Sequence, residues 1–345
     1  MNDVELLQRM VSIPSVSGQE AELAGFLVRE MAARGFRAYV DEAGNAVGEL
    51  GEGPEEILLL GHMDTVPGLI PVQVVGGRLY GRGSVDAKGP LAAFIAAATR
   101  VGPRAGKRIV VVGAVEEEST TSKGARHLLG TRRPGMAIIG EPSGWERITL
   151  GYKGRLLVEW RLEQPVGHTA GPARGVCEGA FEFWQAVRGY CEGYNRERER
   201  RFETLDPSLR RIASGGDGLR EWAEATVAFR IPPGLSPAEV RRTVEGWGVA
   251  PAALRFRGAE GPFRAEKNTP VVAALLSGIR AAGGRPAFSL KTGTSDMNVV
   301  GPVWGCPIAA YGPGDSTLDH TPEEHIELAE YERAIEVLVG ALLAV

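Results

Sequence analysis

The first 150 residues alternate short apolar runs with stretches in which apolar residues repeat at helical spacing. The runs EEILLLGHM, RIVVVGAVE and GMAIIGEP are continuous and apolar, and each ends in polar residues. Such runs are typical of strands buried on both faces of a mostly parallel sheet. The helical stretch PLAAFIAAATRV lies between the first two of them. This alternation predicts an α/β domain with helices on both faces of the sheet.

From about residue 152 the pattern changes to strands with one apolar face and one polar face. RLLVEWRLE alternates apolar and polar side chains, as a half-exposed antiparallel strand does. A long helix is expected at about 180–202, and later runs predict a strand, a helix and a last strand. This order is similar to β-α-β-β-α-β, so we expect an inserted α+β, ferredoxin-like domain at 152–263. The first pattern then returns, which predicts a discontinuous α/β domain at 1–151 and 264–345.

Composition and charge narrow the class of protein. The chain has 345 residues with 43% apolar and 24% charged side chains, which is ordinary for a globular protein of two domains. Its net charge of −4 disfavours binding through phosphates, so no nucleic acid partner is expected. No apolar run is long enough to span a membrane, and the N-terminus lacks the basic start of a signal peptide. We therefore expect a cytoplasmic enzyme with no membrane partner.

Acidic residues and a histidine follow the ends of the predicted strands. The run LLLGH ends in His62, and Asp64 follows at a spacing at which its carboxylate can orient the imidazole. Glu116–Glu118 follow the second run and Glu141 follows the third. Adjacent glutamates repel one another unless a cation lies between them. Because ligands bind at the carboxyl ends of strands in open α/β sheets, these side chains indicate a candidate site.

Two further residues complete a set of metal-binding types. Asp86 lies in the glycine-rich segment GRGSVDAKG, where its carboxylate could bridge two cations, and His320 lies in a loop before the closing helix. Two imidazoles and three carboxylates without cysteine favour a catalytic zinc pair over a structural zinc site. The candidate ligands are His62, Asp86, Glu118, Glu141 and His320.

Each motif taken alone also has a purely structural interpretation. The pair His62 and Asp64 could be structural, the segment around Asp86 could be a glycine turn with a helix cap, and the glutamates could form a solvated acidic loop. Phosphate binding is disfavoured because neither GxxxxGK[ST] nor GxGxxG is present. A serine hydrolase is disfavoured because SxxK and GxSxG are absent.

Taken in order, these motifs resemble the M20 family of metallopeptidases and deacylases. GHMDTVP, GRGSVDAKG, the EEE run, IGEPS and DHTPEE match motifs of that family over nearly the whole chain. The resemblance implies a dinuclear zinc-dependent amidohydrolase that acts on linear amide bonds. It also implies two Zn²⁺ per subunit, for which Co²⁺ can substitute. The discontinuous domain would be catalytic, and the insert would be a lid through which a homodimer forms.

The resemblance assigns a role to each candidate residue of the catalytic domain. Asp86 would bridge the two metals, Asp64 would orient His62, and Glu117 would be the general base. The other four ligands would each bind one metal, namely His62, Glu118, Glu141 and His320. A shift of one position would make Glu116 the base and Glu117 the ligand, although the spacing from Glu118 to Gly124 favours the first alignment.

Three motifs resemble substrate-binding segments of the family. In QPVGHTAGP, His168 would reach across the dimer interface and donate to the oxyanion of the neighbouring subunit's substrate. In AFRIPP, Arg230 would bind the substrate carboxylate. In KTGTSDMN, the substrate contacts would come from Gly293, Thr294 and Ser295.

Several stretches, among them FETLDPSLRRI, are similar to one subfamily of amino-group carrier protein lysine/ornithine hydrolases. The similarity implies release of lysine or ornithine from the C-terminal γ-glutamyl group of a small acidic carrier protein, in lysine or arginine biosynthesis. The insert carries a net charge of +2 and the remainder −6, so we expect the arginines of NRERERRF to help bind the carrier. The alternatives are a deacylase for N-acetylornithine or N-succinyl-diaminopimelate, a dipeptidase or carboxypeptidase, and a non-catalytic metal-containing binding protein.

Overall fold

The computed structural model describes the chain except for residues 105, 169, 172–173 and 248–250. The described residues form two compact units. The first consists of Met1–Gly151, Ala265–Leu290 and Ser295–Val345, and the second of Tyr152–Arg264 and Lys291–Thr294. The boundaries expected from the sequence leave residues 291–294 in the discontinuous domain. They group instead with the second unit, where the Lys153 N–H donates to Lys291 O and the Thr294 hydroxyl donates to Lys153 O.

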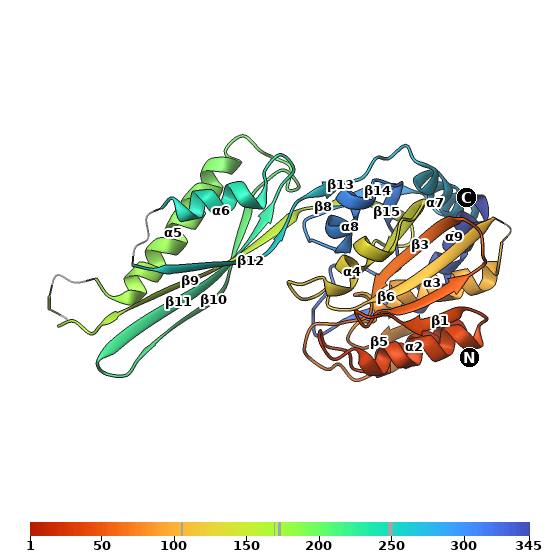
Figure 1. Cartoon of the computed structure of the whole chain (residues 1–345), viewed down its shortest axis with the longest axis horizontal. Coiled ribbons are helices and arrows are strands. Elements are labelled where there is room, and N and C mark those ends of the chain that lie inside the picture. The colour runs from red at the N-terminus through yellow and green to blue at the C-terminus, as the bar shows by residue number, and fades with distance from the viewer. Residues whose placement is uncertain (105, 169, 172–173, 248–250) are drawn as a thin grey trace. The chain divides into compact units, whose positions relative to one another are not determined.

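A nine-stranded mixed sheet forms the framework of the first unit (Figure 1). Its order is β1-β2-β6-β3-β7-β15-β8-β13, and β14 also pairs with β8. The central strands β6, β3, β7 and β15 run parallel, whereas β1, β2 and β8 pair antiparallel. The α/β fold class is confirmed, with antiparallel strands beside a parallel centre. The strands are β1 Arg37–Val40, β2 Ala46–Leu50, β3 Glu55–His62, β6 Lys107–Ala114, β7 Met136–Gly140, β8 Arg147–Tyr152, β13 Phe263–Arg264, β14 Ala287–Lys291 and β15 Ile308–Ala310.

Helices cover both faces of this sheet, because alternate residues of the central strands are buried on opposite sides. Ile57, Leu59 and Val111 belong to one core with α1, α2, α3, α7 and α9. Helix α3 approaches closely, since a Cβ on Gly140 would lie 2.8 Å from Phe94. On the opposite face α4 contacts β6, and α8 contacts β15. The helices are α1 Asp3–Ser12, α2 Ala21–Ala33, α3 Lys88–Val101, α4 Lys123–Thr131, α7 Pro270–Ala281, α8 Asp296–Trp304 and α9 Leu328–Ala344.

The register of the parallel strands aligns their carboxyl ends. His62 of β3 is opposite Ala114 of β6, and Gly61 is opposite Gly140 of β7. Side chains that follow these strands therefore lie at one edge of the sheet. A separate three-stranded sheet, β16-β5-β4, flanks the glycine-rich segment 81–89. Its strands are β4 Gln73–Val75, β5 Arg78–Tyr80 and β16 His325–Glu327.

The second unit is a four-stranded antiparallel sheet of order β10-β11-β9-β12, whose core is shared with α5 and α6. The chain order confirms the predicted β-α-β-β-α-β fold. The long helix ends at Asn195 and not near residue 202, because the Asn195 side chain donates to Leu205 O and accepts the Leu205 N–H. Among the described helices of the chain, none is long and apolar enough to cross a membrane. The elements are β9 Gly154–Pro165, α5 Val176–Asn195, β10 Asp206–Gly216, β11 Arg220–Ile231, α6 Pro237–Glu245 and β12 Ala253–Glu260.

Candidate metal centre

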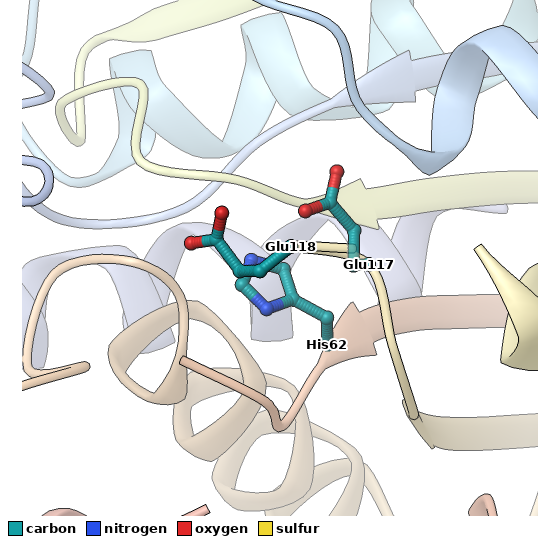
Figure 2. A group of neighbouring side chains, drawn as sticks. All are labelled: His62, Glu117 and Glu118. Atoms are coloured by element: carbon teal, nitrogen blue, oxygen red, sulfur yellow. The ribbon is translucent and has the colours of Figure 1, made fainter. Parts of the chain in front are cut away.

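Side chains suited to metal binding gather where the central strands of the first unit end. His62 is the last residue of β3, Glu117 and Glu118 lie shortly after β6, and Glu141 directly follows β7. Figure 2 shows the His62 ring beside Glu118, with Glu117 next to it on the same segment. One ligand atom from each of these three residues lies within 4.8 Å of the others. The sequence prediction that these strand ends meet is therefore consistent with the structure.

Asp86 and His320 reach the same place from two loops. Asp86 lies between β5 and α3, and His320 lies between β15 and β16 with a left-handed backbone, φ 63°. Asp86 Oδ1 is 3.1 Å from His62 Nε2, and Asp86 Oδ2 is 3.0 Å from His320 Nε2. His320 Nε2 is also 2.8 Å from Glu118 Oε1. Asp86 thus faces two separate imidazoles with its two oxygens.

Of the three sets of residues that could hold a cation among the described residues, two have Asp86 in common. In each set, one ligand atom per residue lies within 4.8 Å of the other two. A carboxylate common to two such sets has the arrangement of a bridging ligand. Together the sets contain all five ligands expected from the sequence. They are His62, Asp86 and Glu141, and Asp86, Glu118 and His320.

Asp64 holds several residues of this cluster in place through hydrogen bonds. It is fully buried, and its two carboxylate oxygens accept the backbone N–H groups of Glu117 and Glu118, each at 3.0 Å. The Ser17 hydroxyl donates to Asp64 Oδ2 at 2.7 Å. His62 Nδ1 is 3.0 Å from Asp64 O and 3.5 Å from Asp64 Oδ1. One side chain therefore orients the imidazole and also the two glutamates.

The segment after α1 holds the ends of β3 and β6 together, and no sequence motif indicated this. The Ser15 hydroxyl donates to Met63 O at 2.7 Å, and Glu20 Oε1 accepts the Glu116 N–H at 3.1 Å. The Glu116 carboxylate accepts the Thr121 hydroxyl, and Glu116 belongs to none of the ligand sets found among the described residues. The small polar residues of PSVSGQE resemble an ordinary turn, so the sequence gives little signal of this role.

Burial and mutual proximity strongly perturb the pKa values of the cluster. Burial raises the pKa of Glu117 well above its usual range, and Glu141 and Glu118 add to this effect. Burial also raises the pKa of Glu118. Burial opposes a charge on His62, yet hydrogen bonds with Asp64 and Asp86 raise its pKa well above the usual range. Hydrogen bonds with Asp86 and Glu118 raise the pKa of His320 to about 10.

These shifts show that the acids of the cluster require positive charge. Protons on the two imidazoles supply part of it, and the pKa of Asp86 falls far below its usual range because His320 and His62 outweigh its burial. A divalent cation bound here would take over this role, since metals bind neutral imidazole and ionised carboxylate. The chemistry and convergence of the donor set therefore fit a pair of divalent cations.

Four of the five expected substrate contacts lie in the second unit, in two separate places. The Arg230 Nη1 group donates to the Thr294 hydroxyl at 3.0 Å, and Gly293 precedes Thr294 in the same segment. His168 Nδ1 accepts the Ala170 N–H at 3.2 Å, in a loop after β9. Arg230 and Thr294 therefore contact each other, whereas His168 lies in the connection between β9 and α5.

Ser295, the remaining expected contact, belongs to the first unit. It caps the N-terminus of α8, and its side chain accepts the Met297 N–H. The next residue, Asp296, is 2% exposed and contributes to the raised pKa of Glu117. Asp296 is therefore a further acid near the predicted base, and the sequence reasoning did not single it out because it follows a helix cap and not a strand.

Comparison with known proteins agrees with this geometry. The model of peptidase family M20/M25/M40 matches residues 58–344. The chain is 49% identical to a LysW-lysine hydrolase of Deinococcus radiodurans, over 98% of this chain and 95% of that protein. It is 40% identical to a protein of Thermococcus kodakarensis provisionally named LysW-lysine/LysW-ornithine hydrolase, over 98% of this chain and 91% of that protein.

A solved structure shares the fold across its length. The M20 family metallo-carboxypeptidase Sso-CP2 from Sulfolobus solfataricus superposes with a TM-score of 0.82, covering 100% of this chain and 99% of that one. The sequence identity is 19%, so this likeness concerns the fold alone. The resemblance inferred from the motifs is confirmed, and the chain belongs to peptidase family M20/M25/M40.

Proposed function

We propose that this chain is a dinuclear zinc-dependent amidohydrolase that releases L-lysine, or L-ornithine, from an amino-group carrier protein. The bond cleaved joins the amino acid to the γ-carboxyl of the carrier's C-terminal glutamate. The chemistry rests on one observation above all, the Asp86 carboxylate whose oxygens face His62 and His320. The substrate rests on similarity to proteins that are named for LysW-lysine and LysW-ornithine hydrolysis. We place the reaction in the cytoplasm, in lysine or arginine biosynthesis.

The five ligands divide into two metal sites. His62 and Glu141 would hold one ion, Glu118 and His320 the other, and Asp86 both. We assign zinc to the pair, with cobalt as a substitute, because imidazole and carboxylate ligands without cysteine suit a catalytic zinc site. When bound, the ions polarise the amide carbonyl and make a water molecule more acidic.

Glu117 is the general base of the proposed reaction. It would accept a proton from the attacking water and pass it to the leaving amine. Its carboxylate is buried beside Glu118 and Glu141, and in the metal-free chain burial raises its pKa. Asp64 supports this role because it binds the Glu117 N–H and so fixes the backbone from which the carboxylate extends.

The second unit would supply the groups that bind the substrate. Arg230 and Thr294, joined by a hydrogen bond, would bind the substrate carboxylate, with Gly293 as a further contact, and the first unit would add Ser295. His168 would come from the other subunit of a homodimer and donate to the oxyanion. A donor of this kind typically contributes about 2.7–4 kcal/mol to the transition state.

The carrier would meet exposed arginines beyond α5. They alternate with Glu197, Glu199 and Glu203, and Arg200 Nη1 lies 3.8 Å from Glu203 Oε1. The Thr204 hydroxyl donates to Arg201 O, and Lys153 links Thr204 to Thr294, since its ammonium group donates to Thr204 O and its carbonyl accepts the Thr294 hydroxyl. The proposed carrier contact therefore lies within reach of the proposed carboxylate site. The arginines are Arg196, Arg198, Arg200 and Arg201.

A release assay tests the substrate assignment. Carrier-linked lysine, carrier-linked ornithine, N-acetylornithine, N-succinyl-diaminopimelate and a dipeptide are compared by kcat/KM with the zinc-loaded protein. We expect the carrier-linked amino acids to be hydrolysed with the highest kcat/KM, and activity to vanish with a chelator and return with Zn²⁺ or Co²⁺. Reversing the four arginine charges should raise KM for the carrier-linked substrate only. A free acyl amino acid that is hydrolysed as efficiently as the carrier-linked form would contradict the assignment.

A further inference from the structure

Glu324 is a buried acid that lies outside the metal cluster but contacts the loop that carries Asp86. It is 0% exposed and directly precedes β16. Its Oε1 atom accepts the backbone N–H groups of Gly83, Val85 and Asp86 at 2.9, 3.0 and 3.2 Å. One carboxylate oxygen therefore accepts three backbone N–H groups of the glycine-rich segment. Amide groups that converge on an anion in this way form a nest that holds the backbone in one conformation.

The other oxygen of Glu324 binds a guanidinium. Arg82 Nη1 donates to Glu324 Oε2 at 2.6 Å, and the same nitrogen donates to Thr321 O at 3.2 Å. In addition, the Gly81 N–H donates to the backbone carbonyl of Glu324 at 3.3 Å. Charge-assisted bonds of this kind are about twice as strong as neutral ones. The contacts join segment 81–86 to segment 321–324 through both side chains and backbone.

This junction connects two candidate ligands that lie far apart in the sequence. Asp86 ends the segment that Glu324 binds, and His320 lies four residues before Glu324. By contrast, His62 and Glu141 are placed by the ends of β3 and β7, which the sheet itself aligns. Glu324 is thus positioned to set the spacing between Asp86 and His320, whereas the other pair of ligands depends on the sheet.

We propose that Glu324 is a positioning residue for the metal site of Asp86, Glu118 and His320. This inference rests on the proposed metal centre. Groups that orient metal ligands without touching the metal typically change affinity by about 10–100-fold when they are removed. In Glu324→Gln the amide oxygen can still accept backbone N–H groups, but the charge that binds Arg82 and the nest is lost. The ion held with His320 should therefore be weakened selectively.

The test is a calorimetric titration of the metal-free protein with Zn²⁺, together with the absorption spectrum of the Co²⁺-loaded protein. The wild type should bind two ions. In Glu324→Gln one ion should bind about 10–100-fold more weakly, with an altered Co²⁺ spectrum, while the other stays within about twofold. The neighbouring acid Glu323 is exposed, so Glu323→Gln is the matched control and should leave both ions unchanged.

A second variant identifies the affected site. His320→Ala removes a ligand of the same ion. In the double variant His320→Ala with Glu324→Gln, the affinity of the remaining ion should therefore differ little from its affinity in His320→Ala alone. If Glu324→Gln does not fold, Arg82→Met replaces it and should weaken the same ion by a smaller factor.

A folded Glu324→Gln that binds both ions as the wild type does, or binds both equally weakly, would overturn the inference. So would an Arg82→Met that leaves both ions unchanged when the glutamine variant does not fold. A wild type that binds no pair of ions would instead overturn the proposed function itself.

Discussion

Buried carboxylates occur in two regions of the first unit, and the regions differ in what balances their charge. Glu49 of β2 and Glu56 of β3 both contact Arg132, at 2.6 and 3.2 Å, and the two glutamate side chains are 4% exposed. Asp86 instead contacts the imidazoles of His62 and His320, at 3.1 and 3.0 Å. The positive charge in the first region is permanent, because it belongs to arginine. In the second region it belongs to histidines, which can release a proton.

The pKa values follow this difference. Burial would raise the pKa of Glu49, yet hydrogen bonds from Arg132 and Arg37 lower it. Burial raises the pKa of Glu117, and neighbouring acids raise it further. Guanidinium groups remain charged in proteins, whereas an imidazole can release its proton to become a metal ligand. A buried acid therefore has a structural role where it pairs with arginine, and it is available to bind a cation where it pairs with histidine.

The largest expected effect belongs to the proposed base. Glu117→Gln removes the proton acceptor but keeps the shape of the side chain, so kcat should fall by about 10²–10⁴-fold. Zinc stoichiometry, measured on the same preparation, should be unchanged. The control is Glu116→Gln, because Glu116 lies outside the ligand sets and should cost only a few-fold. Equal losses in the two variants would show that the assignment of Glu117 is wrong.

The second prediction concerns the arginine-balanced region. Arg132→Met removes the guanidinium that Glu49 and Glu56 both contact. Arg37 and Arg108 still pair with the two glutamates, so the expected cost is about 1–3 kcal/mol, below that of a buried charge left with no partner. The free energy of unfolding in urea measures this cost, and zinc stoichiometry should not change. Arg133 is exposed, so Arg133→Met should stay within about 0.5 kcal/mol of the wild type. A loss below about 1 kcal/mol in Arg132→Met would contradict a structural role for this network.

The smallest effect is a pH dependence of stability. Because the pKa of Glu49 is lower in the folded chain, protons bind the unfolded chain more tightly. Its stabilising contribution is present above the ordinary glutamate pKa and is lost as pH falls through the folded value. Urea unfolding between neutral and acidic pH should therefore show a steeper decline for the wild type than for Glu49→Gln. Parallel curves would mean that Glu49 contributes no such linkage.

Much of the first unit could be predicted, because the ends of its strands are visible in the sequence as the ends of apolar runs. Continuous apolar runs end at His62, before Glu117 and before Glu141, and parallel register then brings those residues to one edge. The α/β class and the β-α-β-β-α-β insert followed from the same periodicities. The family resemblance supplied the roles, which the residue types alone left open.

Contacts between distant backbone segments could not be predicted in this way. Glu324 binds N–H groups more than 230 residues away, and Glu20 binds the Glu116 N–H across 96 residues. Glu20 lies in none of the motifs, and Glu324 ends the DHTPEE motif without any signal that separates it from its exposed neighbour Glu323. The early end of α5 could not be predicted for the same reason, since the hydrogen bonds between Asn195 and Leu205 depend on how the intervening chain folds.

The account depends most directly on Asp86 being shared by two cations. Titration of metal-free protein with Zn²⁺, for the wild type and for Asp86→Asn, measures this in one experiment. We predict two ions per wild-type chain and the loss of tight binding of at least one ion in Asp86→Asn, because an amide cannot replace a bridging carboxylate's charge. Two ions bound by both proteins with the same affinity would contradict the account.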